Sequence, residues 1–247
     1  MKFISKILSY LLSVVFFLLF GILLLLFDPI QRVCLNIFGY NTHRKSVAVF
    51  NWFTLRTLHI LGTTFKITLP KSLPKNKPVI IVSNHQSMWD IPPIIWFLRS
   101  LHPKFISKKE LGKGIPTISY NLKHGGSVLI DRNNPEQATE EIKKIAQYIS
   151  KHNRGVVIFP EGTRSRTGTP KPFKYKGLKT LFENAPDAYV VPVSISNSWK
   201  LQRYGIFPIP LGTRLTFQIH SAIKVGDFEH EELIQKLEKQ ITENVTH

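Results

Sequence analysis

The segment that decides the fold reads Pro78-Val79-Ile80-Ile81-Val82-Ser83-Asn84-His85-Gln86-Ser87-Met88-Trp89-Asp90. Its first half is an unbroken apolar run, which is typical of a strand buried on both faces of a helix-covered sheet. Ligands of such sheets collect at the carboxyl ends of the strands. The polar residues after the run, His85 and Asp90 among them, are therefore expected at a binding cleft.

Further short apolar runs recur along the chain and alternate with helical patterns. The expected strands are Lys104–Ile106, Ser127–Ile130, Val156–Phe159, Tyr189–Ile195 and Leu215–Ile219. Asn134-Pro135 followed by Gln137 is a helix start signal. Asp227 is expected to cap a last helix that buries Leu233, Ile234, Leu237 and Ile241. This alternation predicts an α/β domain over residues 66–247, with a mostly parallel or mixed sheet flanked by helices.

The amino-terminal segment is hydrophobic. No charged residue occurs from Ile7 to Phe27, and as a helix this stretch extends roughly 30 Å, about one hydrocarbon core. Asp28-Pro29 is expected to end it. Residues 1–65 are therefore predicted to form a membrane-anchoring segment. Basic residues flank both ends, so a single span and a helical hairpin, with residues 46–61 as its second arm, both remain open.

The composition narrows the choice of partner. Lys and Arg total 33 against 16 Asp and Glu in 247 residues, giving a formal net charge of +17, which favours polyanions. Because the hydrophobic segment already offers a membrane as partner, nucleic acid is not expected. The single cysteine, Cys34, excludes an intrachain disulfide and a cysteine-cluster metal site.

The residues after the first strand suit acyl transfer to a hydroxyl. A neutral imidazole is the usual base for removing the proton of an attacking hydroxyl, and a carboxylate on its other nitrogen fixes the tautomer. His85 and Asp90 could meet if the histidine lies in the turn and the aspartate in the first helical turn. Each residue alone has an ordinary explanation, a loop histidine and a helix-start residue. The whole heptad favours the catalytic interpretation.

A second polar segment follows a later strand and suits a phosphate group. Phe159-Pro160-Glu161-Gly162-Thr163-Arg164-Ser165 places an arginine beside a glycine turn. Arginine binds a phosphate dianion through two parallel hydrogen bonds, and glycine lets backbone N–H groups approach it. The alternative is a surface turn with a solvated arginine. Arg132 is either a second phosphate ligand or a partner for Asp131.

Four segments, taken together, resemble the lysophosphatidic-acid (1-acylglycerol-3-phosphate) acyltransferase family of the glycerolipid acyltransferase superfamily. In chain order they are Asn84-His85-Gln86-Ser87-x-x-Asp90, Gly126–Arg132, Phe159–Ser165 and Val191-Pro192-Val193-Ser194. The resemblance covers roughly residues 78–197.

The resemblance implies a role for each matched residue. His85 would be the base and Asp90 its partner, with Asn84 and Ser87 in support. The acceptor's glycerol phosphate would contact Arg132, Glu161, Gly162, Thr163 and Arg164. The acyl donor would be acyl-coenzyme A or acyl-acyl carrier protein, with no metal or other cofactor. The product would be phosphatidic acid at a membrane; in a bacterium this would be the inner membrane, with the domain facing the cytoplasm.

Two alternatives compete with this interpretation. An acyltransferase for another lysophospholipid or a lyso-aminolipid would share the His–Asp pair, but two arginines favour an acceptor with a phosphate monoester. A non-catalytic protein that binds anionic lipid would explain the charge and the anchor. It gives no reason for a histidine and an aspartate in one loop. The sequence does not indicate acyl-chain length or oligomeric state.

Overall fold

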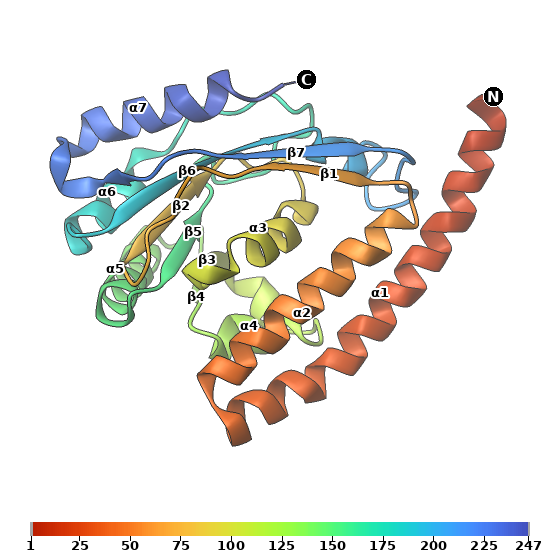
Figure 1. Cartoon of the computed structure of the whole chain (residues 1–247), viewed down its shortest axis with the longest axis horizontal. Helices are drawn as coiled ribbons and strands as arrows, with labels where there is room; N and C mark the ends of the chain where they lie inside the picture. Colours follow the sequence, from red (N-terminus) through yellow and green to blue (C-terminus); the bar gives the residue numbers. More distant parts are fainter. Residues whose placement is uncertain (1, 247) are drawn as a thin grey trace.

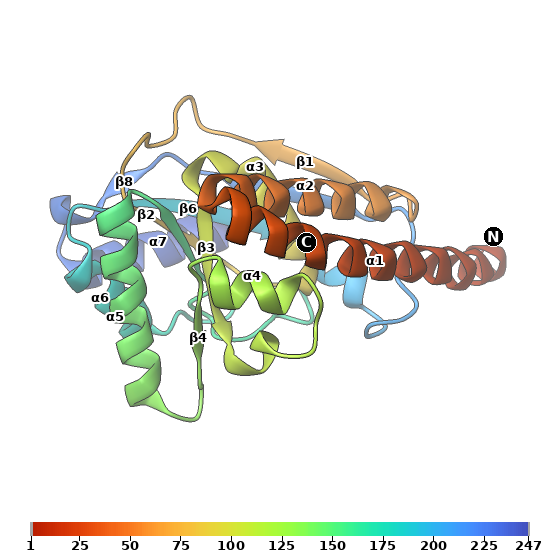
Figure 2. The same ribbon diagram turned by 90° about the horizontal axis from the view of Figure 1, so that it is seen from below.

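The computed structural model describes residues 2–246, with side chains from Ser5 onward. Two long helices come first, α1 (Lys2–Phe38) and α2 (Tyr40–His59). They lie side by side as an antiparallel hairpin against one side of the α/β domain, and both views show this arrangement (Figures 1 and 2). Gly39 joins them with φ +77°, a conformation that glycine adopts without strain.

An eight-stranded sheet forms the centre of the molecule. Its strands are β1 (Thr64–Thr68), β2 (Val79–Ser83), β3 (Pro103–Lys108), β4 (Val128–Ile130), β5 (Gly155–Ile158), β6 (Tyr189–Ser196), β7 (Arg214–Ile219) and β8 (Ile223–Lys224). The spatial order is β1-β7-β6-β2-β5-β3-β4, with β8 paired to β6. Only the β6–β7 and β6–β8 pairs are antiparallel. The sheet is mixed, and the predicted fold class is confirmed.

Helices cover both faces of the sheet. After α1 and α2 they are α3 (Ile91–Phe97), α4 (Ile118–His124), α5 (Pro135–His152), α6 (Tyr175–Asn184) and α7 (His230–Glu243). Alternate side chains of β2 pack on opposite faces of the sheet. Ile81 packs with residues of α1, α2 and α3, whereas Ile80 and Val82 pack with α5, α6 and α7. Burial on both faces explains the unbroken apolar run of this strand.

The helix starts were predicted with mixed success. Asn134 caps α5 by accepting a hydrogen bond from the Gln137 amide at 3.0 Å, as expected. The stripe of α7 is also confirmed, since Leu233, Ile234, Leu237 and Ile241 are fully buried. The prediction that Asp227 caps α7 is wrong. Asp227 lies in a short turn (Val225–Asp227), and α7 begins at His230 without a side-chain cap.

The prediction that Asp28-Pro29 ends the first helix is also wrong, because α1 continues to Phe38. Contacts from outside the helix hold this turn. Thr117 donates its hydroxyl to the Leu24 carbonyl and its amide to Asp28 Oδ1, both at 2.7 Å. A proline removes only one helical hydrogen bond, and these tertiary contacts offset that loss.

Two elements between residues 40 and 68 differ from expectation. The second helix begins at Tyr40, earlier than the predicted arm at residues 46–61. A strand that was not predicted, β1, begins at Thr64, so the expected boundary between residues 65 and 66 falls inside it. The outer limits of the two predicted regions, Met1 and His247, lie outside the described residues.

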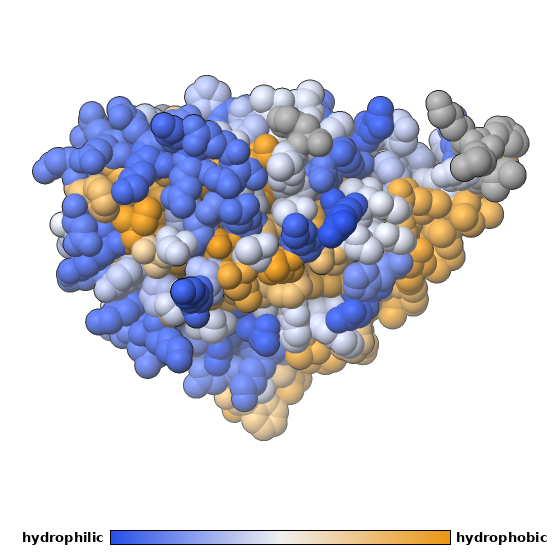
Figure 3. All heavy atoms as spheres, turned by 45° about the horizontal axis from the view of Figure 1, so that its top comes forward, coloured by the Kyte–Doolittle hydropathy of each residue, from blue (hydrophilic) through white to orange (hydrophobic). Residues whose placement is uncertain are grey.

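Of the described helices, only α1 is long and apolar enough to cross a membrane, over Ser5–Phe38. One side of it packs on the domain, and large apolar side chains cover the other. Leu11, Leu18, Ile22 and Leu25 are more than half exposed. Figure 3 shows apolar residues gathered along the lower right margin of the molecule, where α1 lies, while hydrophilic residues dominate the remaining visible surface.

Candidate active site

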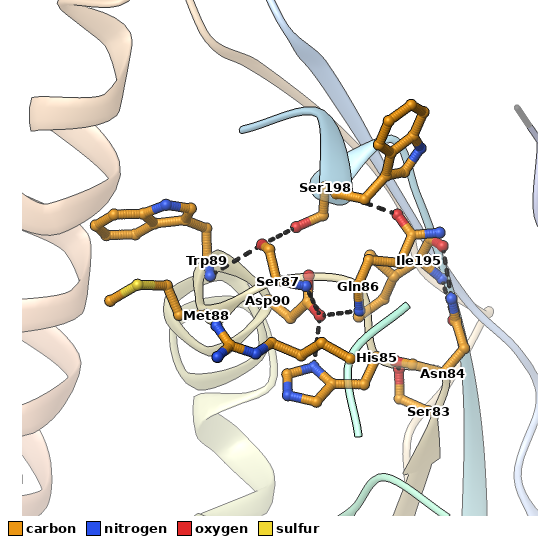
Figure 4. A network of polar contacts seen from close by, with 12 residues as sticks. Ser83, Asn84, His85, Gln86, Ser87, Met88, Trp89, Asp90, Ile195 and Ser198 are labelled. Carbon is orange, nitrogen blue, oxygen red and sulfur yellow. Dashed lines mark hydrogen bonds and ion pairs between the residues drawn. The ribbon is translucent and has the colours of Figure 1, made fainter. Parts of the chain in front are cut away.

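The loop after β2 brings His85 and Asp90 into direct contact. His85 Nδ1 lies 2.7 Å from Asp90 Oδ2, and the aspartate is fully buried. Asp90 ends a short helical turn (Met88–Asp90) that leads into α3. The chain turns back at this point, so residues five apart in sequence meet, as Figure 4 shows. The expected convergence of these two side chains is present.

Backbone amides hold the aspartate in place. Asp90 Oδ2 also accepts hydrogen bonds from the amides of Gln86 at 2.7 Å and Ser87 at 3.0 Å. The Ser87 hydroxyl accepts from the Trp89 amide at 3.0 Å, which completes a capping box. With Nδ1 occupied by the carboxylate, the other ring nitrogen of His85, Nε2, is left for a substrate. The ring stacks on Phe159, with centroids 4.0 Å apart.

Two buried side chains of the same loop, Asn84 and Ser87, bind it to β6 and to the turn after β6. Asn84 makes a pair of hydrogen bonds with the backbone of Ile195 in β6, donating at 2.8 Å and accepting at 2.7 Å. The Ser87 hydroxyl contacts that of Ser198, in the turn that follows β6. Both residues are completely buried, so they can hold the loop but cannot reach a bound molecule.

Glu161 holds the histidine from the neighbouring strand. Its two oxygens accept from the amides of His85, at 2.7 Å, and Lys171, at 2.9 Å. Burial raises the pKa of Glu161 to about 7, although these two amide donors oppose the shift. The carboxyl group was predicted to contact the acceptor. The structure places it 2% exposed, with both oxygens on backbone amides.

Gly162, Thr163 and Arg164 form the open rim next to His85. Gly162 has φ +71° and the Lys174 side chain crosses it, within 3.2 Å of where a Cβ would stand. Thr163 and Arg164 are exposed. Arg164 Nη1 donates to Gln202 Oε1 at 3.0 Å, and the same oxygen accepts from the Met88 amide at 3.1 Å. Gln202 thus links the two predicted motifs, and no sequence signal indicated it.

Arg132 lies in the turn after β4, a strand that is separated from β5 by β3. Loss of hydration lowers the pKa of Arg132, Glu110 opposes that shift, and the positive charge of Arg164 adds to it. Asp131 pairs with Lys109, so the alternative in which Arg132 merely partners Asp131 is wrong.

Gln86 and Ser165 also shape the site, although neither was a candidate. Gln86 is buried and donates to the Gly168 carbonyl at 3.0 Å, which ties the first motif to the loop after Ser165. Ser165 donates its amide to the His85 carbonyl at 2.7 Å. Both residues lie inside the two quoted motifs, so the spacing signal contained them without revealing their contacts.

Comparison with known proteins gives a consistent family. Residues 64–196 match the family described as Acyltransferase. A 1-acyl-sn-glycerol-3-phosphate acyltransferase of Cocos nucifera is 32% identical over 203 residues, which are 80% of this chain and 58% of the relative. The same-named protein of Helicobacter pylori is 37% identical over 134 residues, 51% of this chain and 54% of that one. The chain thus spans little more than half the length of these relatives.

A solved structure matches nearly the whole chain. The crystal structure of the 1-acyl-sn-glycerophosphate (LPA) acyltransferase PlsC from Thermotoga maritima superposes with a TM-score of 0.77 at 25% identity. The match covers 97% of this chain and 95% of that one, so it includes the helical hairpin as well as the sheet.

Proposed function

The chain belongs to the acyltransferase family, and from this premise we propose that it transfers a fatty acyl group to the free sn-2 hydroxyl of 1-acyl-sn-glycerol 3-phosphate, giving phosphatidic acid. The observation that carries the proposal is the 2.7 Å contact between His85 and Asp90 at the carboxyl end of β2, inside the region that matches the family. The similar proteins named above support the choice of acceptor.

In the proposed reaction, His85 acts as the base. Its Nε2 removes the proton of the acceptor hydroxyl while the hydroxyl oxygen attacks the thioester carbonyl carbon. The tetrahedral intermediate then collapses, the carbon–sulfur bond breaks, and the thiolate leaves with the proton returned by the imidazolium. Asp90 stabilises that imidazolium and holds its tautomer. Such base catalysis typically contributes about 10²–10⁴-fold to the rate.

Arg132 and Arg164 are proposed to bind the phosphate of the acceptor. Two guanidinium groups match a phosphate monoester, which carries up to two negative charges. Gly162 and Thr163 would supply backbone and hydroxyl donors at the same rim. Asn84, Ser87 and Glu161 are proposed as positioning residues, because their polar atoms already bond to the protein itself.

The proposed membrane association rests on α1. The helix is tied to the domain near its start, where Ser9 donates to the Ile209 carbonyl at 2.8 Å, and again at Asp28, which accepts from Thr117. A helix fastened at two distant points cannot cross a bilayer while the domain stays outside. We therefore favour α1 lying along the membrane surface, with its exposed apolar face in one leaflet.

An activity panel tests the proposal. Purified full-length protein in detergent is given 1-acyl-sn-glycerol 3-phosphate with acyl-coenzyme A or with acyl-acyl carrier protein, and phosphatidic acid is measured. His85→Ala is expected to lower the rate at least about 10²-fold. The matched control is His152→Ala, an exposed histidine on α5, which should keep wild-type activity. Turnover of His85→Ala within a few fold of wild type would remove histidine from the mechanism.

The same panel identifies the acceptor and the donor. Lysophosphatidylcholine and lysophosphatidylethanolamine carry phosphodiesters, so the two arginines predict much poorer use of these than of the monoester. A preference for a lyso-aminolipid or a phosphodiester would replace the proposed acceptor but keep the acyl-transfer chemistry. The ratio of rates with the two thioesters decides the acyl carrier.

A further inference from the structure

A second group of basic side chains lies away from the site described above. Arg44, Arg99, His102 and Lys104 line a small pocket between the start of α2, the end of α3 and the start of β3. Lys104 stands at the amino end of β3 and pairs in register with Val156 of β5. His85 follows the carboxyl end of a strand parallel to β5. The pocket and the candidate active site therefore lie at opposite ends of the parallel strands.

The charges in this pocket are not compensated. Among the described residues, no acidic side chain forms an ion pair with Arg44, Arg99, Lys104 or Arg154. Lys104 is only 6% exposed, and Arg44 Nε is buried without a hydrogen-bond partner. Burial and the charges of Arg154 and Arg44 lower the pKa of Lys104 to about 7. Buried cations are normally paired, so this arrangement lacks its counter-charge.

The aromatic ring of Tyr40 contacts two of these cations and stabilises them in part. Lys104 Nζ lies 4.7 Å from the centroid of Tyr40, and the Arg154 guanidinium lies 3.4 Å from the same ring. Cation–π contacts of this kind are weaker than ion pairs. Two cations that share one neutral ring still repel each other, and the ring supplies no negative charge.

We propose that the pocket lined by Arg44, Arg99, His102 and Lys104 binds a phosphate group. Arginine and lysine side chains together match phosphate oxygens. The phosphate can come from an anionic lipid headgroup or from solution. The lipid source has support from the adjoining hairpin turn, where Ile37 and Phe38 are 70% and 65% exposed and suited to the acyl region beside a headgroup.

Thermal unfolding of the full-length protein in detergent, followed by tryptophan fluorescence, tests this proposal without using acyl transfer. Potassium phosphate is compared with potassium chloride at equal ionic strength. Phosphate at ten times its Kd is expected to raise the wild-type Tm by roughly 3–5 °C. In Lys104→Met the rise should be smaller, because the substitution removes the charge of this pocket and keeps most of the volume, while Arg132 and Arg164 are unchanged. Without phosphate this variant should melt at or above the wild-type temperature.

Two further variants are measured, one outside the pocket as a control and one within it. Lys66→Met removes an exposed charge from β1, at the far edge of the sheet, and should keep the full phosphate effect. Arg99→Gln removes a charge from an exposed residue of the pocket and should also reduce the phosphate effect. It provides the test if Lys104→Met does not fold. Equal phosphate effects in wild type and in both pocket variants would overturn the proposal, as would no effect in wild type.

A second set of Tm measurements distinguishes a lipid headgroup from free phosphate. Micelles doped with phosphatidylglycerol are compared with micelles of the uncharged detergent alone. A Tm rise with the lipid that is smaller in Lys104→Met and kept in Lys66→Met supports a headgroup site. A rise with inorganic phosphate only supports a site for free phosphate. Because the readout is binding, the result stands whether or not the protein transfers acyl groups.

Discussion

Asp90 engages three donors through a single oxygen, which allows its charge to be tested separately from its shape. Asp90→Asn keeps an oxygen that can accept from the amides of Gln86 and Ser87, but it loses the negative charge beside the imidazolium. We expect kcat to fall by about 10²–10⁴-fold with little change in the acceptor KM. Steady-state kinetics on the variant, with its melting temperature as a folding check, measures this. Activity within threefold of wild type would contradict the assigned role.

Glu161 makes a residue-scale prediction about pH. Burial raises its pKa from 4.5 to about 7, so the folded protein holds this proton more tightly than the unfolded chain does. The resulting stability is fully present below a pH of about 4.5 and is lost as the pH rises through about 7. Glu161→Gln does not titrate. The Tm of wild type minus that of Glu161→Gln should therefore fall by several degrees between about pH 5 and about pH 8. A difference that stays constant or grows would show that the carboxyl group is not shifted upward.

At the scale of elements, the amino end of α5 positions the loop that carries Arg132. The Gln137 side chain accepts from the Asp131 amide at 2.8 Å and donates to the Leu129 carbonyl at 3.0 Å, so it holds both sides of the turn after β4. Gln137→Ala should raise the acceptor KM about 3–10-fold and lower stability by about 1–2 kcal/mol. Asn134→Ala is the matched control. It removes the helix cap at a cost of about 1 kcal/mol but leaves the bonds to the loop. Equal KM values for the two variants would refute a role for Gln137 in placing Arg132.

The elements also show where sequence reasoning succeeds and where it ends. β2 was predictable because burial on both faces produces a continuous apolar run. β1 was not, because it is a five-residue edge strand with alternating exposure, and its only partner, β7, lies about 150 residues away in the chain. Pro29 misled the prediction of α1 because its lost hydrogen bond is offset by Thr117, whose partners Asp28 and Leu24 lie 89 and 93 residues away in the chain.

In the candidate site too, contacts within one loop were predictable from the sequence and contacts between distant segments were not. His85 and Asp90 were predictable because one short loop carries both, and local spacing limits where their side chains can go. The contacts of Ser87 with Ser198 and of Arg164 with Gln202 join segments that only the folded sheet brings together. Glu161 was assigned to the acceptor because it lies within a matched motif. Its bonds to the amides of His85 and Lys171 depend on strands β2 and β5 being neighbours, which the sequence did not indicate.

For the whole molecule, the exposed face of α1 is the feature that joins the proposed chemistry to a membrane. Leu18 and Leu25 are 63% and 67% exposed, and they do not support the core. Their replacement by lysine should leave folding intact, while each lysine placed in hydrocarbon costs roughly 2.5–3.5 kcal/mol. We expect Leu18→Lys/Leu25→Lys to reduce partition into phosphatidylcholine vesicles by at least about 10²-fold, even if snorkelling offsets part of that cost.

Flotation of protein with vesicles at several lipid concentrations measures this partition. Leu69→Lys is the matched control, because Leu69 is 50% exposed and follows β1 in the loop toward β2, away from α1. That variant should float like wild type. The double variant should still turn over a short-chain acceptor that dissolves as monomers, since His85, Asp90 and the arginine rim are unchanged. Undiminished flotation of the double variant would mean that another surface carries the attachment. The net charge of +17 would then be the first to examine, by adding salt to vesicles that contain anionic lipid.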